Sequence, residues 1–231
     1  MGIDEIISQP FSGYSNESYQ FLKSLAIRRN NNKEWFDKHR NIYENFLKRE
    51  VRELVDTLAP KVNAIDPSFV LNHKSILRIN RDIRFKKDKT PYKTFSAVSF
   101  GLRVLKQKDI PQIYFHFSSN EFLIAAGQYS TEPSTMKKIR QKIVNNTDDF
   151  LEIINNPQFQ KEYKKIYGEK LLRLPIIFSK YKNTNLEKYL LYKNMYVYKE
   201  YKPEVAMKPD LVELILYHTR LMYKFLKFLS N

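Results

Sequence analysis

The chain has 231 residues, of which 42% are hydrophobic, 28% charged and 14% aromatic, with only 5 glycines and 10 prolines. This composition excludes collagen-like, linker-like and disordered chains and predicts a folded interior rich in Phe and Tyr, burying about 70% of the surface that the unfolded chain exposes. Because the sequence contains no cysteine, it excludes disulfides, thiolate nucleophiles and thiolate zinc sites.

The formal net charge of +15 favours anionic partners, either an anionic small molecule or nucleic acid. A dispersed excess of lysine is usually a solvated surface, so only clustered charge carries functional weight. The first residues form no apolar run, and no stretch approaches the roughly 18 apolar residues of a membrane span. We therefore expect a cytoplasmic protein without a membrane partner.

The N-terminal part predicts two helices. Residues 16–29 have the apolar spacing of a helix, and the asparagines at 30–32 break it. A second helix follows, with Asn31 as its N-cap and Glu34 three residues later in a pattern like a capping box. Its apolar stripe continues to Pro60, where we expect the helix to end.

Between residues 75 and 130 the apolar period changes to two, which is typical of strands. The predicted strands are 75–85, 94–105, 113–117 and 122–127. The last two are separated by the polar residues 118–121, which predict an antiparallel hairpin.

Helices return after this region. Pro133 is placed as the first residue of a helix, Thr147 as the cap of a helix over 148–154, and Pro209 as the start of a long terminal helix. Residues 196–198 read as a further strand whose tyrosines cover the edge of the sheet.

The order helices, strands, helices predicts an α+β fold rather than an alternating α/β sheet. We expect an antiparallel sheet over about 75–130, with room for a strand near 195–201. Without a repeat or a long linker, the sequence predicts a single domain over 1–231, with a helical N-terminal part at 16–59 and a mainly helical part at 131–231.

Residues 78–93, called the basic loop below, carry seven basic and two acidic side chains, a third of the net charge. If the first half is a strand, alternation gives it an apolar and a polar face. The apolar face is Leu77, Ile79, Ile83 and Phe85. The polar face is Arg78, Asn80, Asp82 and Arg84. Arg81 falls on the apolar face and breaks the pattern.

Arginines in such a polar row can offer paired donors to a phosphate or a carboxylate. The second half, residues 86–93, contains the turn-forming pair Thr90-Pro91, so we expect it to bring its lysines and tyrosine to the end of the strand.

The string from Arg78 to Lys93, with residues 31–36 upstream, resembles the signature of the conserved hypothetical family called domain of unknown function 2461. The resemblance covers the chain from about Tyr19 to the terminal helix. Its weaker landmarks follow in the same order: Gly127-Gln128-Tyr129, Arg140 and Leu172-Arg173-Leu174-Pro175.

The resemblance implies a characteristic charged element but no particular reaction, substrate or cofactor. The residues of this element are Arg78, Arg81, Asp82, Arg84, Asp88, Lys89, Pro91, Tyr92 and Lys93. The chain has Asn80 where relatives often carry an aromatic residue and Lys86 where a small residue is usual, which argues against a stacking role at position 80.

We therefore expect a phosphate- or anion-binding pocket, which in an enzyme would stabilise negative charge during phosphoryl-transfer or phosphodiester chemistry. The catalytic candidates are Asp82, Tyr92 and Lys89, with Asp82 or Tyr92 moving the proton. The ligand-binding candidates are Arg78, Arg81, Arg84, Lys93, His116 and His39.

Three alternatives stay open. The basic loop could serve a non-catalytic module that binds nucleic acid or a protein, together with tyrosines that interleave with lysines between residues 178 and 202. Those tyrosines are at positions 181, 189, 192, 196, 198 and 201. The loop could also be a buried salt-bridge network that fixes the fold, or a solvated sheet face.

The sequence predicts no metal site and no cofactor. Its four histidines lie far apart, and Asp82 and Asp88 lie among seven cations that they neutralise more readily than they bind Mg²⁺. His218 lies on the apolar stripe of the terminal helix, which indicates a hydrogen-bonded core histidine. No P-loop, GxGxxG, GxSxG or HExxH string is present.

Overall fold

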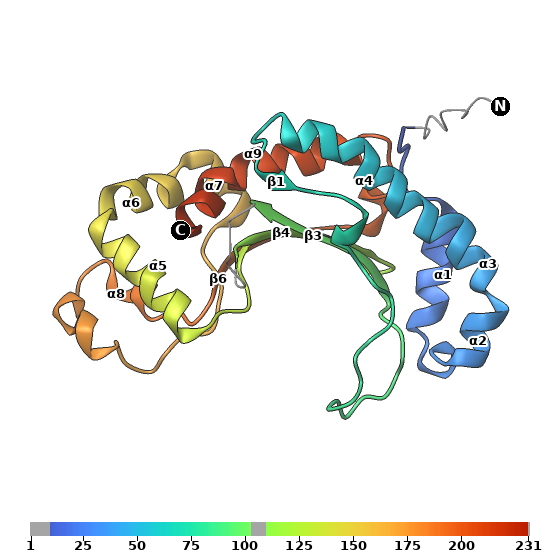
Figure 1. Ribbon diagram of the computed structural model, residues 1–231, viewed down its shortest axis with the longest axis horizontal. Coiled ribbons are helices and arrows are strands. Elements are labelled where there is room, and N and C mark those ends of the chain that lie inside the picture. The colour runs from blue at the N-terminus through green and yellow to red at the C-terminus, as the bar shows by residue number, and fades with distance from the viewer. Residues whose placement is uncertain (1–9, 103–109, 231) are drawn as a thin grey trace. The chain divides into compact units, whose positions relative to one another are not determined.

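The computed structural model describes residues 10–102 and 110–230 (Figure 1). Within these residues the α-helices are α1 (Asn16–Ala26), α2 (Lys33–Lys38), α3 (Arg40–Ile42), α4 (Lys48–Asn63), α5 (Pro133–Asn145), α6 (Thr147–Asn155), α7 (Pro157–Tyr163), α8 (Glu187–Leu190) and α9 (Leu211–Leu229). The strands are β1 (Phe69–Val70), β2 (Ile76–Leu77), β3 (Phe95–Leu102), β4 (Gln112–Ser118), β5 (Phe122–Gln128) and β6 (Met195–Tyr201).

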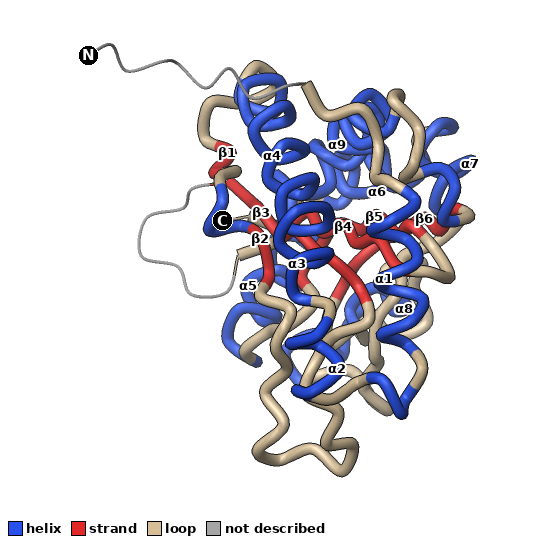
Figure 2. The backbone as a smooth tube through the Cα atoms, turned by 90° about the vertical axis from the view of Figure 1, so that its right-hand side faces the viewer, coloured by secondary structure: helices blue, strands red, loops and turns tan. Residues whose placement is uncertain are grey.

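The described strands form one antiparallel sheet in the order β1-β3-β4-β5-β6, which Figure 2 draws in red. β2 also pairs with β3, in a register that places Ile76 opposite Val98 and Leu77 opposite Ala97. With helices before and after the strands, the fold is α+β, as the order of the sequence patterns predicts.

Contacts between residues divide the chain into two compact units. The first runs up to Phe100 and adds Tyr114–Ile124 and Glu200–Tyr217; the second comprises Gly101–Ile113, Ala125–Lys199 and His218–Asn231. Each unit has its own apolar packing, so each can position side chains for a site.

In the first unit, α4 packs against β1 and buries the apolar stripe of Val51, Leu54 and Leu58. The ring of Tyr14 stacks on that of Phe117 in β4, with ring centres 4.4 Å apart. In the second unit, Phe150 of α6 packs edge-on against Tyr189 and also meets Phe228 of α9. These buried aromatic contacts match the interior that the composition predicts.

The predicted second helix is wrong in its start and its continuity. Asn32, not Asn31, caps α2, and its side chain accepts a hydrogen bond from the Trp35 N–H. α2, α3 and a π-helical turn at Tyr43–Leu47 precede α4, which continues through Pro60 to Asn63. The proline is tolerated because Leu58 and Val62 on either side of it stay fully buried, and their packing offsets one lost backbone hydrogen bond.

The predicted strand over 75–85 is also wrong, since only Ile76–Leu77 of that range is a strand. Two aspartates compete with strand pairing by accepting hydrogen bonds from the backbone N–H two residues ahead, in the manner of Asx turns. Asp82 Oδ1 accepts from Arg84 N at 3.2 Å, and Asp88 Oδ1 accepts from Thr90 N at 3.1 Å. Phe85, placed on the core face by alternation, is 94% exposed.

The later elements follow the sequence closely. β3 begins one residue after its predicted start, and residues 103–105 of that prediction lie outside the described residues. The hairpin of β4 and β5 is confirmed, as are Pro133 at the start of α5 and the strand around residues 196–198, which lies in β6 at the edge of the sheet.

Two predicted helix starts are wrong by one or two residues. Asn146 occupies the N-cap position of α6, and Thr147 Oγ1 donates instead to the Ile143 carbonyl at 3.1 Å. The terminal helix α9 begins at Leu211, two residues after Pro209. None of the helices in the described ranges combines the length and the apolar composition needed to cross a bilayer.

Candidate functional site

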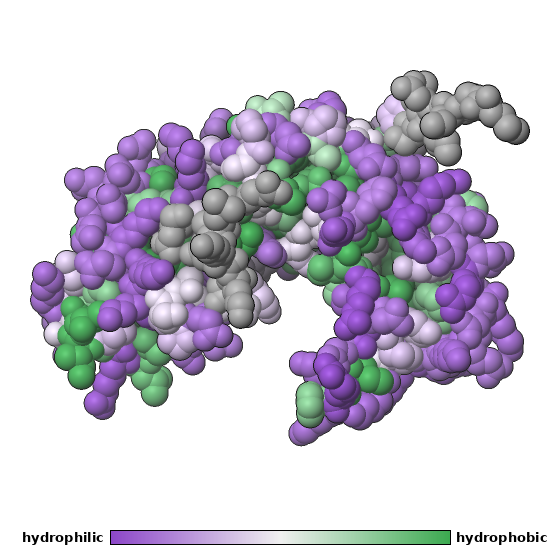
Figure 3. All heavy atoms as spheres, in the orientation of Figure 1, coloured by the Kyte–Doolittle hydropathy of each residue, from purple (hydrophilic) through white to green (hydrophobic). Residues whose placement is uncertain are grey.

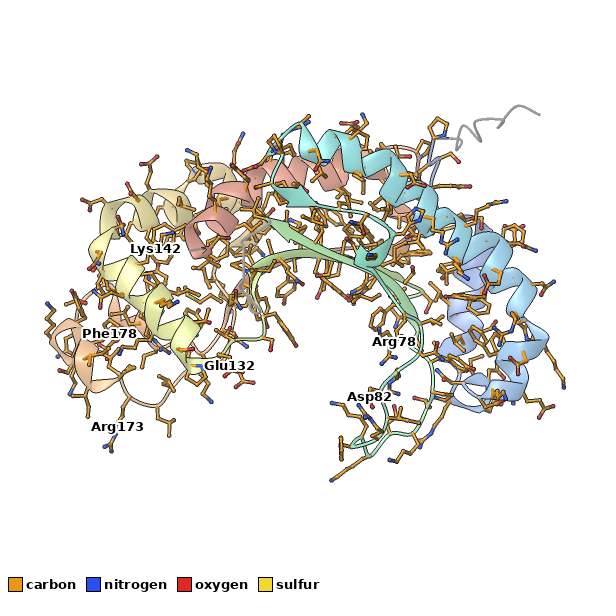
Figure 4. The ribbon with its side chains drawn as sticks, viewed as in Figure 1. Arg78, Asp82, Glu132, Lys142, Arg173 and Phe178 are labelled. Atoms are coloured by element: carbon orange, nitrogen blue, oxygen red, sulfur yellow. The ribbon has the colours of Figure 1, made fainter. Side chains whose placement is uncertain are left out.

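The basic loop is closed at its base by backbone pairing. Asn80 and Tyr92 form an antiparallel bridge, and the Arg81 N–H donates to the Pro91 carbonyl at 2.8 Å. Figure 1 shows the loop extending away from the strands, and Figure 4 places Asp82 further along it than Arg78. The short ladder therefore holds the loop ends together while residues 82–90 run outside any strand.

Asn31 joins the N-terminal helices to this base. Its side-chain Nδ2 donates to the Tyr92 carbonyl at 3.0 Å and to the Leu25 carbonyl at 3.3 Å, and its Oδ1 accepts from the Tyr92 N–H at 3.0 Å. The Tyr92 ring stacks on Phe36, with ring centres 4.1 Å apart. Asn31 thus pairs with the backbone of Tyr92 as a second strand would, on the side away from Asn80. The expected role of Asn31 as a helix cap is wrong.

Arg81, in the first half of the basic loop, donates hydrogen bonds to residues of its second half. Its Nη1 donates to Asp88 Oδ2 at 2.6 Å and to the Thr90 carbonyl at 3.0 Å, and it also contacts Thr90 Oγ1. Hydrogen bonds from the Thr90 backbone, and then from Arg81, lower the pKa of Asp88 to about 2. The break in alternation at Arg81 therefore marks an internal tether across the loop.

Arg84 and Asp82 form a second ion pair at the surface. Arg84 donates through Nε and Nη2 to the two carboxylate oxygens, at 3.0 and 2.7 Å. These hydrogen bonds from Arg84 lower the pKa of the Asp82 carboxyl. A carboxylate held in this way is a weak base, which lowers its suitability for moving a proton.

The two lysines of the predicted site contact backbone carbonyls. Lys89 Nζ donates to the Ile83 carbonyl at 3.0 Å, which folds the loop back on itself. Lys93 Nζ donates to the Arg78 carbonyl at 2.6 Å. Burial, and then the positive charge of Arg78, lower the pKa of Lys93.

A cavity of about 630 Å³ lies in the first unit, between the basic loop and the end of α1. Its lining residues are Ala26, Arg28, Asn31, Arg81, Asp82, Asp88, Thr90, Tyr92, Lys93, Thr94 and Phe95. Both carboxylates in the lining already pair with arginines, Asp82 with Arg84 and Asp88 with Arg81.

The predicted site residues are brought together only in part. Those that line the cavity are Arg81, Asp82, Tyr92 and Lys93. Those that do not line it are Arg78, Arg84, Lys89, His39 and His116. Burial raises the pKa of Tyr92, so its hydroxyl stays a donor near neutral pH. Arg28 was not among the predicted residues. Its only signal was its position at the end of the predicted first helix, three residues before Asn31, which contacts the loop.

His116 belongs to a hydrogen-bonded chain beside the cavity. Its Nδ1 lies 3.0 Å from the Tyr114 hydroxyl, and its Nε2 lies 3.1 Å from Glu121 Oε1. Burial lowers the pKa of His116, against the opposing effect of Glu121. Its ring lies 5.0 Å from that of Phe95, which does line the cavity. His116 therefore contacts Phe95, which lines the cavity, but does not line the cavity itself.

His39 packs on the N-terminal helices instead. Its ring stacks on Trp35 at 4.0 Å, and its Nδ1–H donates to the Trp35 carbonyl at 2.8 Å. In the second unit, the fully buried His218 lies 2.7 Å from the Tyr163 hydroxyl, which confirms the prediction of a core histidine.

The tyrosines between residues 178 and 202 mostly take part in packing. Tyr192 is buried, and its hydroxyl donates to the Ile166 carbonyl at 2.6 Å. Tyr196 and Tyr198 are half-buried and lie against Tyr167. In the described part of the chain, no three His, Asp or Glu side chains gather as metal ligands would.

Comparison with known proteins identifies the family. A family model described as a conserved hypothetical protein, DUF2461, matches residues 17–228. A search of the curated proteins gave no match. The family match includes the basic loop, Asn31 and Arg28, the three parts that enclose the cavity. Because it spans nearly the whole chain, this protein belongs to the DUF2461 family.

Proposed function

We propose that the cavity beside the basic loop binds a phosphate-bearing small molecule. The observation that carries this proposal is the charge left over in the lining. The carboxylates of Asp82 and Asp88 are each neutralised by an arginine, whereas Arg28 has no acidic partner among the described residues, and Lys93 contacts only a carbonyl.

An anion in the cavity would relieve an existing repulsion. The charges of Arg78 and Lys93 disfavour each other, and burial of Lys93 adds to the cost of its positive charge. A phosphate between Arg28 and Lys93 would offset both effects. Guanidinium donors match the paired oxygens of phosphate, and the ammonium adds a point charge.

The size and walls of the cavity fit a small molecule. A volume of about 630 Å³ falls within the range of roughly 300–1,000 Å³ that is usual for ligand sites. Ala26 and Phe95 supply apolar wall, and Tyr92 also lines the cavity. These walls leave room for an organic group attached to the phosphate, while the phosphate itself is the part that the cations would bind.

Calorimetric titration of the full chain with pyrophosphate tests the proposal. We expect Arg28→Ala to weaken binding about tenfold or more, since one hydrogen bond to a charged group contributes about 1.5–3 kcal/mol. Arg29→Ala is the matched control, because Arg29 is the next residue, is also exposed, and does not line the cavity. Equal losses in the two variants, or a wild-type chain that binds no pyrophosphate, would contradict the proposal.

A second function is favoured by one observation. Phe85 is 94% exposed, carries the Arg84 guanidinium over its ring at 6.0 Å, and is followed by two lysines, which suits stacking on a base of single-stranded nucleic acid. Salt separates the two functions: nucleic-acid affinity should fall steeply with ionic strength and should be weakened by Phe85→Ala, which leaves pyrophosphate binding unchanged.

A further inference from the structure

The second unit has three large aliphatic side chains that are exposed to solvent. Leu172 is 102% exposed, Ile176 is 89% exposed and Ile177 is 55% exposed, all within residues 170–182. Single exposed aliphatic residues are ordinary, but three within six positions are not. Figure 3 shows hydrophobic surface at the lower left, where Figure 1 draws this segment.

The 170–182 segment is also strongly basic. It contains four cations, Lys170, Arg173, Lys180 and Lys182, and no acidic residue. Among the described residues, Arg173 and Lys182 have no acidic partner, and Figure 4 shows the Arg173 side chain pointing away from the loop that carries it. Exposed aliphatic groups and uncompensated positive charge therefore occupy the same short stretch.

The backbone under these side chains is held firmly. The Leu171 N–H donates to the Leu191 carbonyl at 2.8 Å, and the backbones of Lys170 and Tyr192 form an antiparallel β-bridge. Phe178 is buried and its N–H donates to the Pro175 carbonyl at 2.8 Å. The Arg140 side chain donates to the carbonyls of Leu190 and Tyr192, in the stretch of chain that pairs with residues 170–171. The apolar side chains are thus projected from an anchored loop rather than left loose.

We propose that the 170–182 segment binds the surface of an anionic phospholipid bilayer. The aliphatic side chains would enter the boundary between headgroups and acyl chains, while the cations stay among the phosphates. Leu172 and Ile176 project almost completely into solvent, which fits a soft interface, whereas a protein partner would need a matching pocket for each of them. Such attachment is peripheral and needs no membrane-spanning helix. It departs from the expectation of no membrane partner, which rested on the lack of a long apolar run in the sequence.

The proposal is tested by sedimenting the full chain with lipid vesicles. We expect binding to vesicles of equal phosphatidylglycerol and phosphatidylcholine, weakening as salt screens the cations, and at least about tenfold weaker binding to phosphatidylcholine alone. Ile176→Asp should reduce binding to the anionic vesicles about tenfold or more. Because Ile176 is exposed, the circular dichroism spectrum and the unfolding midpoint of the Ile176→Asp variant should match those of the wild type.

Phe85→Asp is the matched control, since it changes charge equally at a similarly exposed apolar residue of the first unit. It should leave vesicle binding within about twofold of the wild type. Loss of binding in Phe85→Asp but not in Ile176→Asp would overturn the proposal. Failure of the wild-type chain to bind the anionic vesicles would also overturn the proposal. This holds even if sedimentation equilibrium shows that the chain self-associates through Leu172 and Ile176.

Discussion

Neighbouring asparagines at positions 31 and 32 perform different tasks, and only one of them is a helix cap. The Asn32 side chain makes two exposed hydrogen bonds, accepting from the Trp35 N–H and donating to the Arg29 carbonyl. The Asn31 side chain is buried and makes three hydrogen bonds to main-chain atoms of Tyr92 and Leu25. The difference lies in tertiary packing, so sequence alone could not assign the two roles.

Asn31→Ala should lower the free energy of unfolding by about 2 kcal/mol or more, because it leaves buried polar groups of Tyr92 without partners. Asn32→Ala removes a cap and a hydrogen bond to the Arg29 carbonyl, both exposed to solvent, and should cost about 1 kcal/mol. Urea unfolding of both variants measures the difference. Equal losses, or a larger loss for Asn32→Ala, would refute the role given to Asn31.

Asp88 supplies a prediction about pH. Its folded-state pKa of about 2 lies below the ordinary value of 3.8, so its contribution to stability is present above pH 4 and is lost as the pH falls towards 2. The carboxyl-carbon NMR shift of Asp88 should titrate near pH 2 in the wild type and at higher pH in Arg81→Gln. A wild-type midpoint near pH 4 would show that the Thr90 and Arg81 hydrogen bonds do not form in solution.

At the scale of elements, the loop over residues 82–90 depends on its internal tether. Arg81 holds both Asp88 and the Thr90 carbonyl, whereas Arg84 holds only the exposed Asp82. Arg81→Gln should therefore speed tryptic cleavage after the loop lysines about threefold or more, because local opening exposes the chain to the protease.

Arg84→Gln is the control, since it also removes one arginine from the loop and one ion pair. It should leave the cleavage rate close to that of the wild type, because exposed ion pairs contribute little. Cleavage that is equally fast in both variants would mean that Arg81 is no tether.

The sequence predicted correctly those strands in which apolar residues alternate and one face is buried. It gave a wrong prediction where side chains form hydrogen bonds with the backbone. The β4–β5 hairpin and β6 follow from alternation, because their inward faces are buried as the pattern requires. Residues 77–85 also alternate, apart from Arg81, yet Asp82 and Asp88 turn the backbone of the basic loop away from strand pairing. For the site, charge identified Arg81 and Lys93, but Arg28 comes from a helix about fifty residues earlier, a proximity that no local pattern encodes.

At the scale of the whole molecule, His218 links folding to pH. Burial lowers its pKa to about 4, against the opposing effect of Glu162, while Lys199 lowers it further. Since the unfolded chain binds a proton near pH 6.5 and the folded chain does not, stability is highest above pH 6.5 and falls as the pH drops towards 4.

The shift corresponds to a loss of up to about 3 kcal/mol between those pH values. Urea unfolding at pH 7 and pH 4.5 should show most of this loss in the wild type and little of it in His218→Gln. If the variant loses as much stability as the wild type, other groups account for the acid sensitivity.

In the function that we propose, uncompensated cations of the first unit enclose a space for an anion. Crystals of the full chain soaked in tungstate, a phosphate analogue with strong anomalous scattering, test it most directly. We predict an anomalous peak inside the cavity, within hydrogen-bonding distance of both Arg28 and Lys93. A cavity without such a peak, with tungstate bound only at surface lysines elsewhere, would contradict the account.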